Sequence, residues 1–313
     1  MIGRVVEIAG ADRYLHLDRG FLVVNTRSDE IGRVPIDDVS ALVGNARGLS
    51  YSNNLLVALA ERGIPFVVCG SHHRPVALLW PVQGHHRQAE RMDAQCTATL
   101  PFRKRLWKQT VQAKIGAQAA VLAHVGKPHA PVARYIGKVR VGDPSNVEGQ
   151  AARLYWPLLF DKSFRRDRNA DGINGLLNYG YAVLRALVAR HVMAAGLHPG
   201  IPLHHANAGN PMRLVDDLME PFRPLVDVWV WRLQRDGCES VEAHAKRELA
   251  LLSTRTLCLP EGRSATSNVV QRYIQSLAQC LVNRTGVPNL GSINAMTLGP
   301  IWESVVDDES EAG

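Results

Sequence analysis

The sequence predicts an α+β protein in which a β-rich N-terminal domain is followed by an all-α C-terminal domain. In the first 86 residues, short apolar or alternating runs are separated by turn residues, as in β-strands. From residue 101 the apolar residues recur at the 3.6-residue period of a helix. A length of 313 residues allows two domains. We expect them at 1–86 and 101–303, with a linker over 87–100 and an acidic tail over 304–313.

The composition excludes several classes of protein. Hydrophobic residues make up 46% of the chain and charged residues 21%, as in globular proteins. No apolar run reaches the roughly 18 residues of a membrane span, and the first residues lack the apolar core of a signal peptide. Five cysteines, odd in number and far apart, argue against a disulfide framework or a structural zinc site. We expect a cytoplasmic protein with no membrane partner.

Strands are expected in the N-terminal domain at seven short runs. These runs are residues 4–8, 14–18, 21–25, 33–36, 40–43, 65–69 and 75–80. One helix interrupts them, with an apolar stripe of Leu55, Leu56 and Leu59 that stops before Gly63. No nucleophile motif, phosphate loop or metal-ligand spacing occurs here, so the catalytic residues are expected in the C-terminal domain.

Positive charge is concentrated in one part of the chain, whose formal net charge is +7. Residues 94–142 contain no Asp or Glu but nine Lys and Arg. Such a stretch is typical of a surface that binds nucleic acid, because each neutralised phosphate releases counterions. The alternative is a solvated basic face that is balanced by acids elsewhere in the fold. The candidate phosphate contacts are Arg103, Lys104, Lys108, Arg165, Arg166 and Arg168.

The first helix of the C-terminal domain begins near residue 101 and is long. Its apolar stripe contains Trp107, Val111, Ile115 and Leu122, and four basic residues, at 103, 104, 108 and 114, lie mostly off this stripe. Further helices are expected from Asp143, over 174–195, up to about 235, over 241–253 and over 269–282. Asp143 is a strong N-cap, and Pro144 is tolerated at the first helical position.

Two acids close to a pair of histidines suggest a metal site. Asp217 and Glu220 are three residues apart, so they share a face of a helix, and His204-His205 precede them in a loop. Pro221 cannot continue the helix, which places Glu220 at a discontinuity. Carboxylates and an imidazole suit magnesium, manganese or zinc. The alternative is a surface helix with an exposed acid pair. Glu148, on a sequence-distant helix among small residues, is a candidate third ligand.

Several motifs resemble those of the universal CRISPR-associated adaptation integrases. The first is Gly-Asp-Pro-Ser-Asn-Val-Glu-Gly-Gln-Ala-Ala-Arg-Leu-Tyr-Trp at 142–156, and the second is Asn-Gly-Leu-Leu-Asn-Tyr-Gly-Tyr at 174–181. The third combines Gly-Leu-His-Pro at 196–199, the double histidine, and Asp-Leu-Met-Glu-Pro-Phe-Arg-Pro at 217–224. The double histidine and Met-Glu-Pro-Phe-Arg-Pro are most similar to the type II branch. The order and spacing of the motifs extend the resemblance over nearly the whole chain.

The resemblance implies a metal-dependent DNA endonuclease and integrase. It implies Mg²⁺ or Mn²⁺ held by Glu148, His205 and Glu220, with Asp217 as an accessory acid. It also implies a homodimer that joins a small second CRISPR adaptation protein in a heterohexameric complex. In such a complex, dimerisation and partner contacts would belong to the N-terminal domain, and catalysis to the C-terminal domain. Such complexes insert short DNA fragments (spacers) into the CRISPR repeat by attack of 3′-hydroxyls. His205 could instead transfer protons. Ala206 departs from the basic residue expected after the double histidine.

Two other functions stay open, and only the first of them uses the same residues. One is a general metal-dependent nuclease that acts on branched DNA or RNA. The other is a non-catalytic DNA-binding scaffold that only holds its partner. Covalent joining of DNA ends distinguishes the integrase from both.

Overall fold

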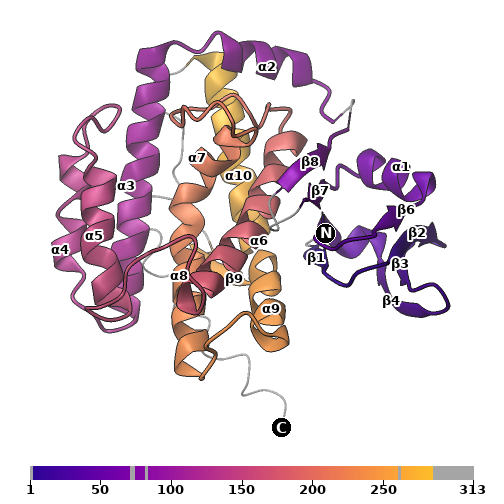
Figure 1. Cartoon of the computed structure of the whole chain (residues 1–313). Helices are drawn as coiled ribbons and strands as arrows, with labels where there is room; N and C mark the ends of the chain where they lie inside the picture. Colours follow the sequence, from indigo (N-terminus) through magenta and orange to yellow (C-terminus); the bar gives the residue numbers. More distant parts are fainter. Residues whose placement is uncertain (1–2, 71–74, 82–83, 260–261, 285–313) are drawn as a thin grey trace.

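The structure is a computed structural model, and it describes residues 3–70, 75–81, 84–259 and 262–284. It confirms the α+β class, because a strand-rich N-terminal part is followed by a mostly helical part (Figure 1). The expected acidic tail at 304–313 lies outside the described residues. No helix in the described part of the chain is long and apolar enough to cross a membrane.

The N-terminal domain contains two four-stranded sheets. The first has the order β1-β5-β7-β8, in which the first three strands are parallel and β8 is antiparallel. The second has the order β4-β3-β2-β6. The strands are β1 (Arg4–Ile8), β2 (Tyr14–Asp18), β3 (Phe21–Asn25), β4 (Glu30–Pro35), β5 (Val39–Gly44), β6 (Ser50–Tyr51), β7 (Phe66–Cys69) and β8 (Pro75–Leu79). All seven expected strands are present, and β6 was not expected because it has only two residues.

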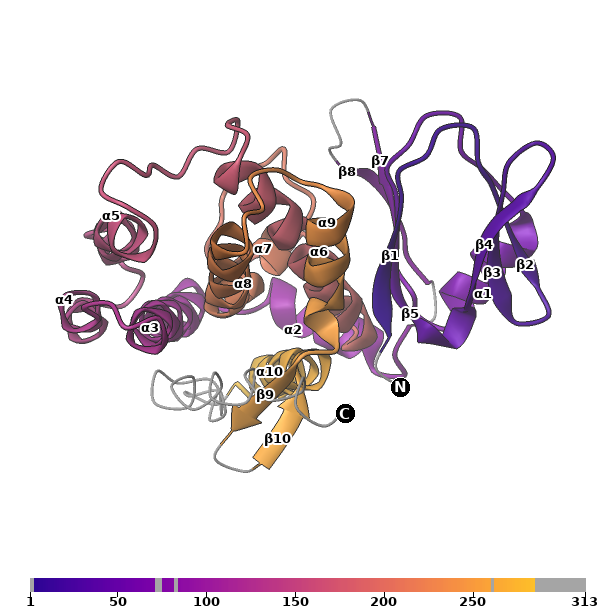
Figure 2. The same cartoon turned by 90° about the horizontal axis from the view of Figure 1, so that it is seen from below.

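Apolar side chains from the two sheets and α1 (Asn53–Glu61) form the core of this domain. Leu15, Leu22, Leu55 and Leu59 are fully buried within it. The opposite face of the first sheet packs against the helices of the C-terminal part. Val5, on this face, belongs to the helical core. Figure 2 shows the first sheet between the helices and the second sheet. The first sheet therefore contributes side chains to two separate hydrophobic cores, one on each of its faces.

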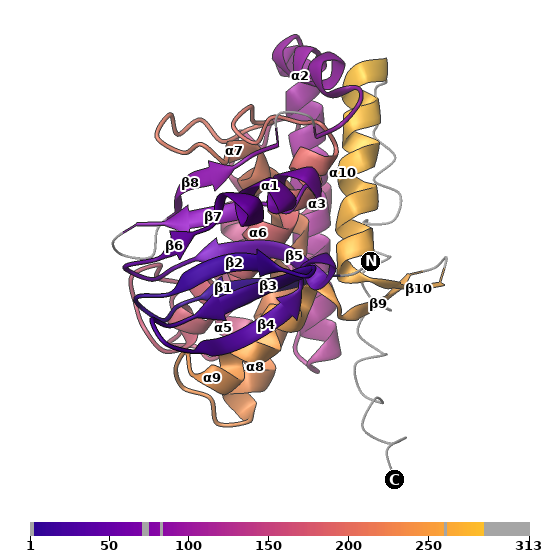
Figure 3. The ribbon, with the colours of Figure 1, turned by 90° about the vertical axis from the view of Figure 1, so that its right-hand side faces the viewer.

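Nine α-helices are described in the C-terminal part of the chain. They are α2 (Gln88–Cys96), α3 (Leu100–His124), α4 (Ala130–Ala133), α5 (Val147–Leu159), α6 (Ile173–Ala194), α7 (Arg213–Met219), α8 (Arg223–Arg235), α9 (Ala243–Ala250) and α10 (Thr266–Asn283). The central helix is α6, which contacts α7, α8, α9, α10 and strand β5. Figure 3 shows the N-terminal strands lying in front of α6. Arg190 of α6 donates a hydrogen bond of 2.8 Å to the carbonyl of Val39, which ties the domains together.

The C-terminal part is not entirely helical, so the all-α expectation is wrong in one place. Strands β9 (Thr256–Leu259) and β10 (Gly262–Ala265) form an antiparallel pair between α9 and α10. Thr256 and Leu257 start a run that is too short for a stable helix and rich in residues that strands accept. The hairpin leads directly into α10.

The expected linker over 87–100 contains a helix, α2. Arg91 of α2 donates to the carbonyl of Ala195 at 2.7 Å. The amide of Gln95 donates to the carbonyls of His198 and Ile201, at 3.2 and 3.3 Å. Polar side chains hold this helix against the end of α6, so its sequence shows no apolar stripe from which a packed helix could be predicted.

Candidate active site

Two side chains before α5 fix the position of Glu148. Asn146 adopts a left-handed conformation, with φ of 50°, and its side chain accepts a hydrogen bond from the amide of Gly149 at 3.0 Å. The Asp143 carboxylate accepts from the amides of Val147 and Glu148, at 2.8 and 3.0 Å. Asn146 is therefore the N-cap of α5, which begins at Val147. The expectation that Asp143 is the N-cap, with Pro144 in the first helical position, is wrong, although the Asp143 carboxylate still accepts from the first two amides of the helix. Glu148 lies in the first turn of α5.

Glu220 lies where the chain changes from an α-helix to a 3₁₀ turn. Helix α7 ends at Met219, and Glu220 opens a 3₁₀ turn, η4 (Glu220–Phe222), before α8 begins. The expected discontinuity at Pro221 is therefore confirmed. The Glu220 side chain is only 7% exposed, and a buried carboxylate requires a positive partner.

Lys114 of α3 lies between the two glutamates. Its Nζ atom is 2.5 Å from Glu148 Oε1 and 2.5 Å from Glu220 Oε2. Burial disfavours the charged form of Lys114, but the carboxylates of Glu220 and Glu148 outweigh burial and raise its pKa. Because both carboxylates contact one ammonium nitrogen, they converge on a single cation position. The three residues that meet here come from three elements, α3, α5 and η4.

Arg223 is a second cation at Glu220. Its Nε atom donates to Glu220 Oε1 at 2.9 Å, and its guanidinium lies 4.6 Å from the centre of the Tyr181 ring. Burial would raise the pKa of Glu220, but Arg223 and Lys114 together lower it. Glu220 is therefore a charged carboxylate in a buried place.

His205 is oriented by Asp217. The Nδ1 atom of His205 is 2.6 Å from Asp217 Oδ1, and Asp217 is fully buried. Asp217 also accepts hydrogen bonds from the backbone amides of Leu203, His204 and His205. The hydrogen bond to Asp217 raises the pKa of His205, against the effect of burial. With Nδ1 engaged by a carboxylate, Nε2 is the ring nitrogen that remains for a ligand or a proton.

The side chains of Glu148, His205 and Glu220 are of the types that bind a divalent metal ion. Glu220 Oε2 is buried and contacts Lys114 Nζ without a well-directed hydrogen bond, so it has lone pairs to offer. The negative charge of Glu220 also acts to raise the pKa of His205, though less than Asp217 does. In the described part of the chain, however, no three His, Cys, Asp or Glu side chains are close enough to share an ion as they stand. Lys114 holds the position between the carboxylates.

Sequence reasoning missed the role of Lys114. It was expected among basic residues mostly off the apolar stripe of the helix, but its side chain is only 12% exposed and turns inward. A signal was present: Lys114 follows Trp107 by seven residues and Val111 by three, which puts it on the same helix face. A lone lysine on a buried face requires an acidic partner, and here it has two.

The six candidate DNA contacts lie in different surroundings. Lys104 and Arg168 are exposed, and Lys108 is half-buried. Arg103 is half-buried, with Nη1 3.5 Å from the carbonyl of Pro202. Arg166 is fixed within the protein, because its guanidinium donates to the side chains of Asn174 and Asn178. Arg165 is exposed and donates to the backbone carbonyls of Lys162 and Phe164.

Comparison with known proteins shows the family of this chain. The family model described as "CRISPR associated protein Cas1" matches residues 6–253. The chain belongs to the Cas1 family. It is 36% identical over 225 residues to the CRISPR-associated endonuclease Cas1 of Neisseria meningitidis serogroup C, which covers 71% of this chain and 73% of that protein. The predicted family and the predicted class of enzyme, a CRISPR-associated endonuclease, are confirmed.

Two solved structures share the Cas1 fold of this chain. A casposase bound to its integration product superposes with a TM-score of 0.74 at 19% identity, over 91% of this chain and 92% of that one. A chain of a Cas6-RT-Cas1–Cas2 complex superposes with a TM-score of 0.72 at 17% identity, over 92% of this chain and 36% of that one. The fold thus extends over almost all of this Cas1 chain.

Proposed function

We propose that this Cas1 protein inserts short DNA fragments into a CRISPR array. In the proposed reaction, the 3′-hydroxyl oxygen of a fragment attacks a phosphodiester of the repeat. A new oxygen–phosphorus bond forms, the bond to the repeat's 3′-oxygen breaks, and that oxygen leaves as a hydroxyl. The observation that carries the proposal is the convergence of Glu148 and Glu220 on one cation position at Lys114. The casposase with the same fold, which is bound to an integration product, also supports it.

The proposed metal ligands are Glu148, His205 and Glu220. When bound there, Mg²⁺ or Mn²⁺ would activate the attacking hydroxyl and offset charge on the scissile phosphate. Asp217 is proposed as the residue that orients His205 rather than as a direct ligand, because its two oxygens already accept four hydrogen bonds. His205 Nε2 either binds the ion or transfers a proton. Arg223 keeps Glu220 ionised and in place.

The proposed partners are double-stranded DNA, a second copy of the chain, and the small second CRISPR adaptation protein. A Cas1–Cas2 complex is among the structures with this fold, which supports the last of these. The heterohexamer expected from the sequence is tested by the mass of the mixed complex in light scattering. A mass that never exceeds that of the free proteins contradicts it.

A strand-transfer assay tests the proposed function. A labelled DNA fragment with free 3′-hydroxyls is incubated with repeat DNA and Mg²⁺ or Mn²⁺, and joined products are separated by size. Integration predicts joined product with the unaltered protein and at least 100-fold less with Glu148→Ala or His205→Ala. Cleavage without joining supports the general nuclease. No chemistry, together with retained DNA binding, supports the scaffold.

A further inference from the structure

The loop that carries His205 is anchored at both ends and exposed between them. Its middle, residues 206–209, is exposed. At its start, Asp217 accepts from the His205 amide and contacts the His205 ring. At its end, the Asn210 side chain donates to Asp216. Asp216 and Asp217 are neighbours on α7, and consecutive side chains of a helix point about 100° apart. The two carboxylates therefore reach opposite ends of one loop.

Arg185 of α6, Asp216 and Asn210 form a connected group, which we call the loop clamp. Arg185 Nε donates to Asp216 Oδ1 at 2.7 Å, and Arg185 Nη2 donates to Asp216 Oδ2 at 3.0 Å. The same Nη2 donates to Asn210 Oδ1 at 3.0 Å, and Asn210 Nδ2 donates to Asp216 Oδ2 at 2.6 Å. Each side chain of the clamp thus bonds both of the others. Two parallel bonds between a guanidinium and a carboxylate fix direction as well as distance.

Asn210 connects the clamp to the backbone. Its Oδ1 also accepts from the amide of Met212, just before α7, at 3.0 Å. Its own backbone amide donates to the carbonyl of Asn207 at 3.1 Å. Asn210 therefore ties the loop on one side and the start of α7 on the other to Arg185. Without the clamp, the loop would be held only at the end that carries His205.

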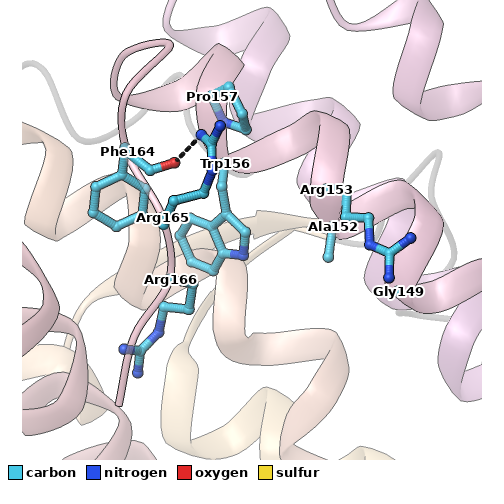
Figure 4. Close-up of a pocket in the computed structure, with 8 residues that line it drawn as sticks. All are labelled: Gly149, Ala152, Arg153, Trp156, Pro157, Phe164, Arg165 and Arg166. Carbon is cyan, nitrogen blue, oxygen red and sulfur yellow. Dashed lines mark hydrogen bonds between the residues drawn. The ribbon is translucent and has the colours of Figure 1, made fainter. Parts of the chain in front are cut away.

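The charge of Arg185 is used within the protein. Figure 4 shows Arg153 and Arg165 at a cavity beside α5, and both are exposed. The Arg185 side chain, in contrast, is only 24% exposed. The hydrogen bonds that the described structure gives it all go to Asp216 and Asn210. A guanidinium engaged in this way has a role other than contact with a phosphate.

We propose that Arg185 and Asn210 are positioning residues for His205. With Asp216 they hold the far end of the loop, so that the imidazole keeps the orientation that its contact with Asp217 gives it. Neither residue touches DNA or metal in this role. The inference rests on the proposed joining of DNA, in which His205 binds the metal ion or transfers a proton.

Trp107 of α3 reports where the loop lies. Its ring stacks on His204, with 4.4 Å between ring centres and 1° between ring planes. It also meets the His205 ring edge-on, with 5.7 Å between centres. Trp107 itself is buried. Because a neighbouring aromatic ring changes the fluorine chemical shift of a labelled indole, movement of the loop should change the Trp107 resonance.

Fluorine NMR of the Asn210→Ala variant tests the proposal without DNA or metal. The protein is labelled with 5-fluorotryptophan, and the Trp107 resonance is assigned by its loss in Trp107→Phe. We expect Asn210→Ala to shift or broaden this resonance and to leave those of the α8 tryptophans in place. Asn207→Ala, which removes another asparagine side chain of the loop, is the matched control and should change nothing. An unchanged Trp107 resonance in Asn210→Ala, or the same change in Asn207→Ala, overturns the proposal.

The kinetics of DNA joining separate positioning from DNA binding. Asn210→Ala and Arg185→Met should each lower kcat about tenfold or more and leave KM for DNA unchanged. The double variant should lose about as much as either single variant, because the clamp acts as a unit. A raised KM at unchanged kcat would make Arg185 a phosphate contact and overturn the proposal.

Two features keep the test decisive. Asn210→Ala leaves the ion pair between Arg185 and Asp216 intact, so it should fold even if Arg185→Met does not, and thermal unfolding checks this. If the unaltered protein joins no DNA, the proposed function fails, while the Trp107 resonance still decides whether the clamp holds the loop.

Discussion

Lys114 carries its positive charge on the buried face of α3, between two acids from other elements. Without it, Glu148 and Glu220 would face each other in a place from which water is largely excluded, and like charges repel strongly there. Lys114 therefore acts as the counter-ion of the site in the absence of metal. A divalent ion bound between the same carboxylates must displace it.

The Lys114→Met variant tests this competition. We expect it to bind Mn²⁺ more tightly than the unaltered protein, because no ammonium has to leave, as measured by calorimetric titration. Without metal it should lose about 3 kcal/mol of stability, since removal of one partner leaves a buried charge unpaired. Lys104→Met, which removes an exposed lysine of the same helix, is the control. Unchanged Mn²⁺ affinity in Lys114→Met would show that Lys114 does not occupy the position of the metal.

Asp227 of α8 connects the helices beneath the site. It accepts hydrogen bonds from the hydroxyls of Tyr155 in α5, at 3.0 Å, and Tyr181 in α6. Burial raises the pKa of Asp227 to about 7, although both hydrogen bonds act in the opposite direction. The folded protein thus binds this proton more tightly than the unfolded chain does. The resulting stabilisation is complete below about pH 4 and is lost as the pH rises through about 7.

The Asp227→Asn variant should remove this pH dependence. Between pH 4 and 7 the free energy of unfolding of the unaltered protein should fall relative to that of the variant, by at most about 1.4 kcal/mol per pH unit. Urea unfolding at several pH values measures both proteins, and their difference isolates the contribution of Asp227. If the free energy of unfolding changed with pH in the same way for both proteins, this would contradict a raised pKa of Asp227.

At the scale of elements, α6 and α8, which carry Tyr181 and Asp227, pack in close contact at Gly180 and Val226. A Cβ atom on Gly180 would lie 2.4 Å from Val226 Cγ1, whereas one on Gly175 of the same helix would lie 3.5 Å from Val241 Cγ2. Only the first distance is too short for an ordinary contact. Glycine at 180 therefore lets the two helices approach.

Alanine substitutions at these two glycines give opposite predictions. Gly180→Ala should destabilise the protein by about 1–3 kcal/mol through overpacking, even though alanine favours helices. Gly175→Ala, the matched control, should be neutral or stabilising by up to about 1 kcal/mol. Thermal unfolding of both variants measures the difference. Val226→Ala should rescue Gly180→Ala, and equal effects of the two alanines would contradict the close-contact account.

The elements could be predicted wherever their periodicity is local. The seven strands and the long helices follow from patterns within a few residues, and the end of α7 before Glu220 follows from Pro221 alone. The hairpin β9–β10 was not predicted, because its strands are short. Helix α2 was missed because its packing depends on hydrogen bonds to residues about 100 positions away.

The candidate site could be predicted only in part for the same reason. The motifs suggest Glu148, His205 and Glu220, but the contacts of Lys114 with the two glutamates require α3 to pack against α5 and η4. This packing is a property of the tertiary fold. The hydrogen bonds of Asp217, the expected accessory acid, to the backbone amides at 203–205 likewise depend on the folded loop and could not be predicted from the sequence.

At the scale of the whole molecule, one sheet joins a small β-core to a large helical core. The basic residues at the start of α3 lie on the helical side. If this surface binds the DNA backbone, its contribution is electrostatic and independent of sequence. The salt dependence of DNA binding then measures how many phosphate contacts this surface makes.

Replacing Arg103, Lys104 and Lys108 together by Gln should weaken DNA binding for every sequence. It should also reduce the slope of log affinity against log salt by up to about 3, close to one for each lost phosphate contact. Fluorescence anisotropy over a range of salt concentrations measures this. Replacing Arg19, Arg27 and Arg47, exposed residues of the N-terminal domain, removes the same charge as a control. Equal slopes for the two triple variants would mean that the α3 residues form a solvated face only.

The position of Mn²⁺ in crystals of the protein, found by anomalous X-ray scattering, would show whether Glu148 and Glu220 hold a metal ion. We expect an ion bonded to Glu148 and Glu220, with His205 as the third ligand or within reach of a bound water, and with Lys114 moved out of the space between the carboxylates. An ion at Asp217, or a crystal soaked in Mn²⁺ in which Lys114 still bridges the two glutamates, would contradict it.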